Sequence, residues 1–129
     1  MMNSAFRLPC VCACAFALGA CNPSFPVACT PNILFGLNVA VVDSLTNAPP
    51  PSATLIARSA AYVDSVGPQS PTTLVTGVFL VLSAAPERAG TYDVTVRSPG
   101  YHEWTRTGVR VTAEECHVRP VALNARLQK

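Results

Sequence analysis

Charged side chains are scarce in this sequence. Only 12% of its 129 residues are Asp, Glu, Lys or Arg, and the nine basic residues are spread singly along the chain. Nucleic-acid binding requires a basic patch or stripe, so the sequence argues against that function. The net charge is +2 and the mean hydropathy is +0.33, which differ from the values typical of highly charged disordered chains.

The chain also lacks the length for two domains. Its 129 residues correspond to one ordinary domain at most, which excludes a two-domain enzyme. It contains twelve Pro and seven Gly, and no segment has a convincing helical periodicity. Such a composition favours many short elements joined by turns.

Residues 1–20 are predicted to be a signal peptide for export. Arg7 is their only charged residue, and it precedes an apolar run, Leu8–Leu18, that is interrupted only by Pro9. A membrane-spanning helix needs about 20 apolar residues, so a transmembrane anchor is the weaker interpretation.

The signal ends in Leu18-Gly19-Ala20-Cys21, which resembles the bacterial lipobox. In that motif the Cys receives a diacylglycerol and becomes the first residue of the mature protein. The resemblance implies lipidation of Cys21, with acyl chains such as palmitate, and a membrane as partner. The second mature residue is Asn22 and not Asp, which resembles the pattern of lipoproteins that are sorted to the outer membrane in Gram-negative bacteria. The alternative is an ordinary secretory signal that leaves Cys21 as a thiol or a disulfide partner.

Residues 21–34 are predicted to be a Pro-rich tether. They contain Pro23, Pro26 and Pro31 and have almost no regular periodicity. Such a segment would hold a following domain, residues 35–129, away from the membrane. We therefore expect a protein that is exported and anchored in the cell envelope, in the outer membrane.

The six cysteines are consistent with an exported protein. Three lie in the predicted signal and Cys21 belongs to the lipobox, which leaves Cys29 and Cys116. In an oxidising compartment these two can form a disulfide that joins the start of the domain to its last predicted strand. The alternatives are a Cys21–Cys29 bond with Cys116 free, or metal ligation. Metal is disfavoured because the sequence has no C-x-x-C motif or paired His spacing.

Alternation with a period of two dominates the remaining chain. It is clearest where Tyr92, Val94 and Val96 alternate with polar residues. The prolines of residues 67–71 predict a loop, and the continuous apolar run of residues 77–83 predicts a buried strand. The pattern predicts an antiparallel sandwich of seven short strands, at 37–42, 53–59, 61–66, 77–83, 92–97, 101–112 and 116–127.

Three strings carry a resemblance to a known family: Asp43–Ala53, Gly77–Phe79 and Gly90–Tyr101. Together they are similar to the carboxypeptidase regulatory-like domain family, over about 90 residues of this chain. The most specific string is Gly90–Tyr101, in which Pro99 and Gly100 favour a tight turn. The resemblance implies an all-β fold, a seven-stranded antiparallel Greek-key sandwich of the transthyretin type.

The sequence predicts no enzyme and no cofactor. In that family, carboxypeptidase activity belongs to a separate zinc domain that is longer than this chain. The transthyretin-like hydrolases of purine degradation end in Tyr-Arg-Gly-Ser, which this chain does not match. His102-Glu103 begins like a zinc-protease motif, but Arg106 stands where the second His is required. No Gly-x-Ser-x-Gly elbow is present, which disfavours a serine hydrolase.

Two weaker groups of charged residues are candidates for sites. The first group contains two imidazoles and two carboxylates that could form a metal site in a loop: His102, Glu114, Glu115 and His117. The favoured interpretation is that they are solvated charges in turns, and we predict no metal. Four arginines could form a basic stripe, although such residues more often keep sheet edges unpaired; they are Arg97, Arg106, Arg110 and Arg119.

Trp104 is the best candidate for a ligand contact, together with its neighbours Tyr101 and His102. Partial burial of Trp104 against the core is nevertheless the favoured expectation. The leading hypothesis is a non-catalytic envelope lipoprotein with a structural or protein-interaction role. The alternative is a glycan- or peptide-binding module that uses Trp104. A small hydrolase or metal enzyme using His102 or His117 is the third hypothesis.

Overall fold

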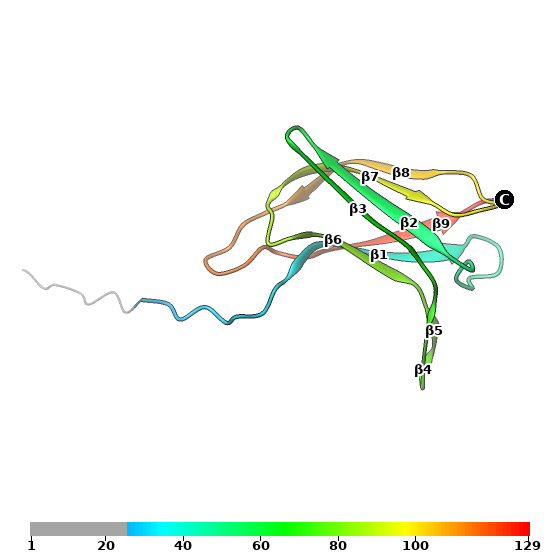
Figure 1. Cartoon of the computed structure of the whole chain (residues 1–129), viewed down its shortest axis with the longest axis horizontal. Coiled ribbons are helices and arrows are strands. Elements are labelled where there is room, and N and C mark those ends of the chain that lie inside the picture. The colour runs from blue at the N-terminus through cyan, green and yellow to red at the C-terminus, as the bar shows by residue number, and fades with distance from the viewer. Residues whose placement is uncertain (1–25) are drawn as a thin grey trace, which may run out of the picture.

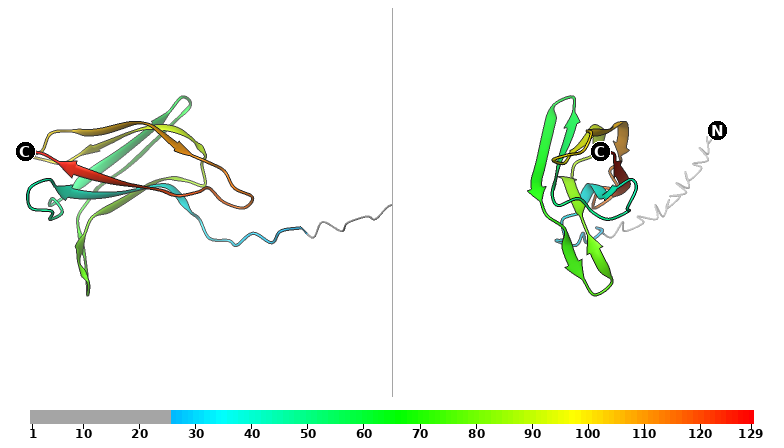
Figure 2. Two further views of the ribbon diagram at one scale, coloured as in Figure 1. Left: turned by 180° about the vertical axis from the view of Figure 1, so that it is seen from behind. Right: turned by 90° about the vertical axis from the view of Figure 1, so that its right-hand side faces the viewer.

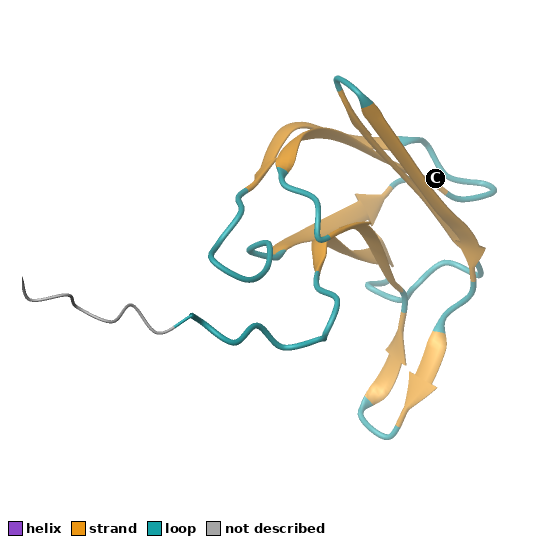
Figure 3. Ribbon diagram, turned by 60° about the vertical axis from the view of Figure 1, so that its left-hand side comes forward, coloured by secondary structure: helices purple, strands orange, loops and turns teal. Residues whose placement is uncertain are grey.

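The computed structural model describes residues 26–129, and every regular element in this range is a β-strand (Figures 1 and 3). The predicted signal peptide and the predicted lipidation of Cys21 lie outside the described residues. Within the described range there is no helix with the length and apolar character needed to cross a membrane.

Residues 26–129 form nine strands in three sheets (Figure 1). The first sheet has the order β6-β1-β9, the second has the order β3-β2-β7-β8, and β4 and β5 form a separate two-stranded hairpin. The strands are β1 (Phe35–Asp43), β2 (Ala53–Ser59), β3 (Tyr62–Gln69), β4 (Thr72–Leu74), β5 (Gly77–Phe79), β6 (Val81–Pro86), β7 (Gly90–Arg97), β8 (Trp104–Val111) and β9 (Val121–Leu127).

The two larger sheets face each other across a single core (Figures 1 and 2). Alternate residues of each strand point inward because successive side chains of a strand lie on opposite faces of its sheet. β7 contributes Tyr92, Val94 and Val96, which are all buried, so the alternation predicted for this segment is confirmed. The other inward-facing side chains of the two sheets are Leu37, Val39, Val41, Leu82, Ala84, Ala125, Leu127, Ala53, Leu55, Ala57, Val109 and Val111.

The expectation of a purely antiparallel arrangement is wrong for β1 and β9. These strands run parallel, with Leu37 opposite Val121 and Asp43 opposite Leu127. A hairpin turn forces its two strands to be antiparallel, but β1 and β9 come from the two ends of the domain and share no turn. The β6-β1-β9 sheet is therefore mixed.

The predicted loop at residues 67–71 is wrong for its first half. β3 continues through Pro68 to Gln69. Pro68 lacks an N–H donor, yet β3 lies at the edge of its sheet and its pairing with β2 shifts register between Ala53 and Leu55. Proline is tolerated at such edge positions and bulges.

The continuous buried strand predicted at residues 77–83 is also wrong. Its first part is β5, which pairs with β4, and its second part begins β6. Leu80 and Leu82 are buried, but Val78 and Phe79 are 49% and 45% exposed. An unbroken apolar run therefore does not mark an unbroken strand here, because the chain changes sheets within it.

The last two strands begin later than predicted. β8 starts at Trp104 and β9 at Val121. Cys116 consequently lies in the connection between them, which holds one isolated bridge between Ala113 and Val118. A disulfide of Cys116 was expected to attach the start of the domain to its last strand. That expectation is wrong, because Cys116 lies in the loop before β9 and not in the strand itself.

Leu82 and Val81 provide a test of which face of β6 is in the core. Leu82 is fully buried, whereas Val81 is 50% exposed. We expect Leu82→Ala to lower the free energy of unfolding by about 2–5 kcal/mol, because it leaves a cavity between the sheets. Val81→Ala is the matched control, for which we expect a change within about 0.5 kcal/mol. Equal losses in chemical denaturation would contradict this assignment of the core.

Candidate functional site

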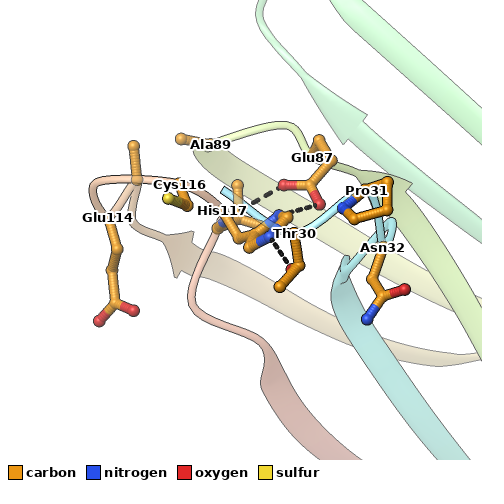
Figure 4. Close-up of a pocket in the computed structure, with 10 residues that line it drawn as sticks. Thr30, Pro31, Asn32, Glu87, Ala89, Glu114, Cys116 and His117 are labelled. Atoms are coloured by element: carbon orange, nitrogen blue, oxygen red, sulfur yellow. Dashed lines mark hydrogen bonds and ion pairs between the residues drawn. The ribbon is translucent and has the colours of Figure 1, made fainter. Parts of the chain in front are cut away.

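A pocket of about 350 Å³ lies where the segment before β1 meets the domain (Figure 4). Three parts of the chain form it: residues 30–32, the turn between β6 and β7, and the β8–β9 loop. Its lining residues include Thr30, Asn32, Glu87, Glu114, Cys116 and His117.

Glu87 connects all three parts. Its Oε1 accepts the backbone N–H of Leu34 at 2.7 Å, and its Oε2 accepts the backbone N–H of Val118 at 3.2 Å. The bond from Leu34 is the main cause that lowers the pKa of Glu87, and His117 and Val118 add to it against the opposing effect of burial. Glu87 also has a φ of 48°, a left-handed conformation that non-glycine residues adopt rarely.

His117 extends this network to the N-terminal segment. Its Nδ1 lies 2.7 Å from Oε1 of Glu87, and its Nε2 lies 3.0 Å from Oγ1 of Thr30 (Figure 4). The order of carboxylate, imidazole and hydroxyl is the same as in a hydrolase triad. A triad also needs N–H donors directed at a substrate oxyanion. The N–H groups of Leu34 and Val118 bind Glu87, so these contacts join the segment before β1 and the β8–β9 loop to the turn after β6.

A disulfide lies directly beside these hydrogen bonds. Cys29 and Cys116 are bonded, with 5.3 Å between their Cα atoms, so this predicted pairing is confirmed and the Cys21–Cys29 alternative is wrong. The residue after each cysteine forms the next contact, because Thr30 bonds His117. By the chain-entropy argument, closing a loop over a sequence separation of 87 stabilises the domain by at most about 4–5 kcal/mol.

Thr30 and Glu87 were not predicted to be members of this site. His117 was a candidate only as a metal ligand or a base. A signal for Thr30 was available, because a bond between Cys29 and Cys116 places their following residues near each other. No feature of the sequence indicated Glu87, which the turn after β6 brings to the site.

The three residues predicted to contact a ligand lie in two different places in the structure. His102 and Trp104 line a second pocket of about 370 Å³, together with Glu103, Thr105, Arg126 and Gln128. Trp104 is partly buried against the core, as favoured. The backbone N–H of His102 donates to the carbonyl of Gln128 at 2.7 Å, which holds this corner to the end of the chain.

Tyr101 does not line that pocket. Its hydroxyl donates to Oδ2 of Asp43 at 3.0 Å. Asp43 is a buried carboxylate whose Oδ1 also accepts the N–H groups of Leu45 and Thr46, at 2.8 and 3.0 Å. These bonds, from Thr46 first and then Leu45, lower the pKa of Asp43 to about 2, with a smaller contribution from Tyr101. Lys129 also lies 3.8 Å from Oδ2.

The other two candidate groups were a loop metal site and a basic stripe, neither of which was the favoured interpretation. Residues 26–129 contain no cluster of three or more His, Cys, Asp or Glu side chains that could hold a metal ion. Two of the four arginines are paired with carboxylates, Arg97 with Glu103 and Arg119 with Glu114. These pairs offset the positive charge of two of the four arginines.

Comparison with protein-family models finds no match for this chain, and comparison with curated proteins finds none either.

The lowered pKa of Asp43 predicts a pH dependence of stability. Its folded pKa of about 2 lies below the ordinary 3.8. The stabilisation is therefore fully present above the unfolded pKa and is lost as the pH falls from about 3.8 towards 2. We expect Asp43→Asn to lower the melting temperature at neutral pH and to remove most of the further loss between these pH values.

Tyr101→Phe serves as the graded control for Asp43. It removes one hydroxyl donor but leaves the two backbone N–H bonds, so most of the acid-dependent loss should remain. Thermal unfolding of the three proteins between pH 5 and pH 2 checks this expectation. An Asp43→Asn variant with the same acid profile as the unsubstituted protein would contradict it.

Proposed function

We propose that this chain is an exported lipoprotein, anchored through Cys21 in the cell envelope. Its β-domain is a non-catalytic structural or protein-interaction module, and Asn22 favours the outer membrane as its location. We also propose that the two facing sheets form a Greek-key sandwich of the carboxypeptidase regulatory-like, transthyretin type. The facing sheets with one shared core support the coarse part of that assignment.

The Cys29–Cys116 disulfide is the observation that carries the proposal. Disulfides persist in oxidising compartments, which an exported protein reaches. Cys29 also stands eight residues after Cys21, so the extended chain between the two spans at most about 29 Å. Without the bond, the free segment would extend to the start of β1 and span about 50 Å. The disulfide therefore sets how far the domain stands from its anchor.

The same fastening protects the first strand. β1 is the central strand of the β6-β1-β9 sheet and carries Leu37, Val39 and Val41 into the core. A pull on the segment before it would otherwise act directly on the end of β1. With the disulfide and the Glu87 contacts in place, the pull reaches the β8–β9 loop and the β6–β7 turn first. This is a mechanical role, which needs no substrate.

The intact mass of the native protein, taken from fractionated cells, tests the proposal. We expect a protein in the membrane fraction that begins at Cys21, carries the mass of attached lipid, and gains one hydrogen per sulfur of a single disulfide on reduction. Cys21→Ser should abolish the lipid mass and the membrane association. Cys29→Ser is the matched control, which should keep the lipid and lose the disulfide. An unlipidated protein cleaved elsewhere would overturn the proposal.

A glycan- or peptide-binding module is the second candidate, because His102 and Trp104 share a pocket with Arg126. Trp104 is the only tryptophan, so its fluorescence reports on this pocket alone. If the candidate is correct, titration with a panel of glycans and peptides should shift the emission, and His102→Ala should weaken the response at least tenfold. Unchanged emission across the panel would remove this candidate.

A further inference from the structure

The β4–β5 hairpin projects away from the body of the domain (Figures 1 and 2). It lies at the end opposite to the segment that precedes β1 (Figure 2). Neither of its strands pairs with a strand of the two larger sheets. Each strand therefore has one edge of backbone N–H and C=O groups that this sheet leaves unpaired, and an isolated hairpin of this kind is only marginally stable in water.

The hairpin and its base expose apolar side chains and carry no charge. Val75 at the tip is fully exposed, and the others are about half exposed: Leu74 57%, Val78 49%, Phe79 45% and Val81 50%. Residues 65–86 include no Asp, Glu, Lys, Arg or His. Proteins usually protect exposed edge strands with charged side chains, Pro or a cover. Within β4 and β5 there is no charged side chain and no Pro, and the short length of three residues each is the protection that these strands have.

The turn of the hairpin is also unusual. Leu74 pairs with Gly77, so Val75 and Thr76 form a two-residue turn. Such turns favour Asn, Asp and Gly, whereas this one places two β-branched residues in solvent. Residues that a turn of this type disfavours are expected where the surface has a function.

We propose that the β4–β5 hairpin is a self-association surface, which pairs edge to edge with the same hairpin of a second copy. A two-fold axis normal to the sheet makes two identical edge strands antiparallel, so the pairing would form a four-stranded sheet across the two copies. Each residue near the axis then faces its own copy. A charge there would face an equal charge, and the charge-free sequence avoids that repulsion.

An apolar cavity at the base of the hairpin supports this occupant. It has a volume of about 160 Å³ and lies between β1 and the start of β6. Its lining includes Val42 and Pro49 together with Val78, Phe79 and Val81. An apolar cavity takes an apolar side chain in preference to water. The exposed apolar side chains of a second hairpin supply such a group.

A lipid bilayer fits the hairpin less well. Its unpaired backbone edges would lose their hydrogen bonds to water in hydrocarbon, which is costly. The hairpin also lies at the end opposite to the segment that leads to Cys21. If the chain is anchored as proposed, copies on equal tethers hold their hairpins at the same height above the membrane. This last step rests on the proposed function, while the preceding ones do not.

Cysteine cross-linking and light scattering test the proposal on the purified chain in which Cys10, Cys12, Cys14 and Cys21 are replaced by Ser, so that the introduced Cys is the only free thiol beside the Cys29–Cys116 disulfide. With a flexible bis-maleimide, which spans pairing through either edge, Thr73→Cys should give a covalent dimer, and Val63→Cys should not. Val78→Lys should weaken dimerisation at least tenfold in light scattering. Val63→Lys is its matched control, because Val63 is a similarly exposed valine (54%) on β3, and it should dimerise like the unsubstituted protein. Melting temperatures of both Lys variants verify that they fold.

Three results would overturn this inference. The first is that the protein is a monomer at every concentration in light scattering and that Thr73→Cys gives no cross-linked dimer. The second is that Val78→Lys dimerises as strongly as the unsubstituted protein. The third is binding of the hairpin to phosphatidylcholine vesicles, lost in Val78→Lys, without any cross-linked dimer. Failure of the anchor would be visible separately, as absence of lipid mass at Cys21. The unlipidated chain could still be tested for dimerisation.

Discussion

Burial of alternate side chains between the two larger sheets is the interaction on which the rest of the structure depends. Each strand of these sheets contributes one face to the core, and apolar burial of this kind is the main favourable term in folding. The core positions the turns at both ends of the domain. The Glu87 network lies at one end and the Asp43 turn at the other, and both are polar contacts that hold chain segments to the finished body.

Two carboxylates have similar mechanical roles in different settings. Asp43 closes the turn after β1 by accepting two nearby N–H groups and one distant hydroxyl. Glu87 accepts N–H groups from two segments that are far from it in sequence. In both cases hydrogen bonds from several donors stabilise the charged carboxylate, and this lowers its pKa. Neither carboxylate needs a substrate to explain its environment.

Much of the fold could be predicted because period-two alternation is a local property. The strand at Tyr92–Arg97 was recognisable for this reason, and the Cys29–Cys116 pair followed from the distribution of the cysteines. The parallel pairing of β1 and β9 could not be predicted, because no turn connects them and local patterns do not encode direction. The division of residues 77–83 was hidden for a related reason, since an apolar residue is compatible with the core and with an exposed hairpin.

The candidate site was predicted less well than the fold. His117 and Cys116 were identified, but their partners Thr30 and Glu87 come from distant segments that only the folded chain brings together. Tyr101 was grouped with Trp104 because they are close in sequence. In the structure the hydroxyl of Tyr101 instead donates to Asp43, which is 58 residues away in the sequence.

The parallel pairing of β1 with β9 also determines when the domain can form. The first strand of the domain receives its partner on that side only after the last strand has been synthesised. Contacts between such distant parts of a chain form slowly, because a long loop must close before they provide any stabilisation. A nascent chain that lacks β9 also lacks the core side chains Ala125 and Leu127. Folding of the domain is thereby delayed until β9 has been synthesised. If the chain is exported as proposed, this delay keeps it unfolded for passage through a narrow translocation channel.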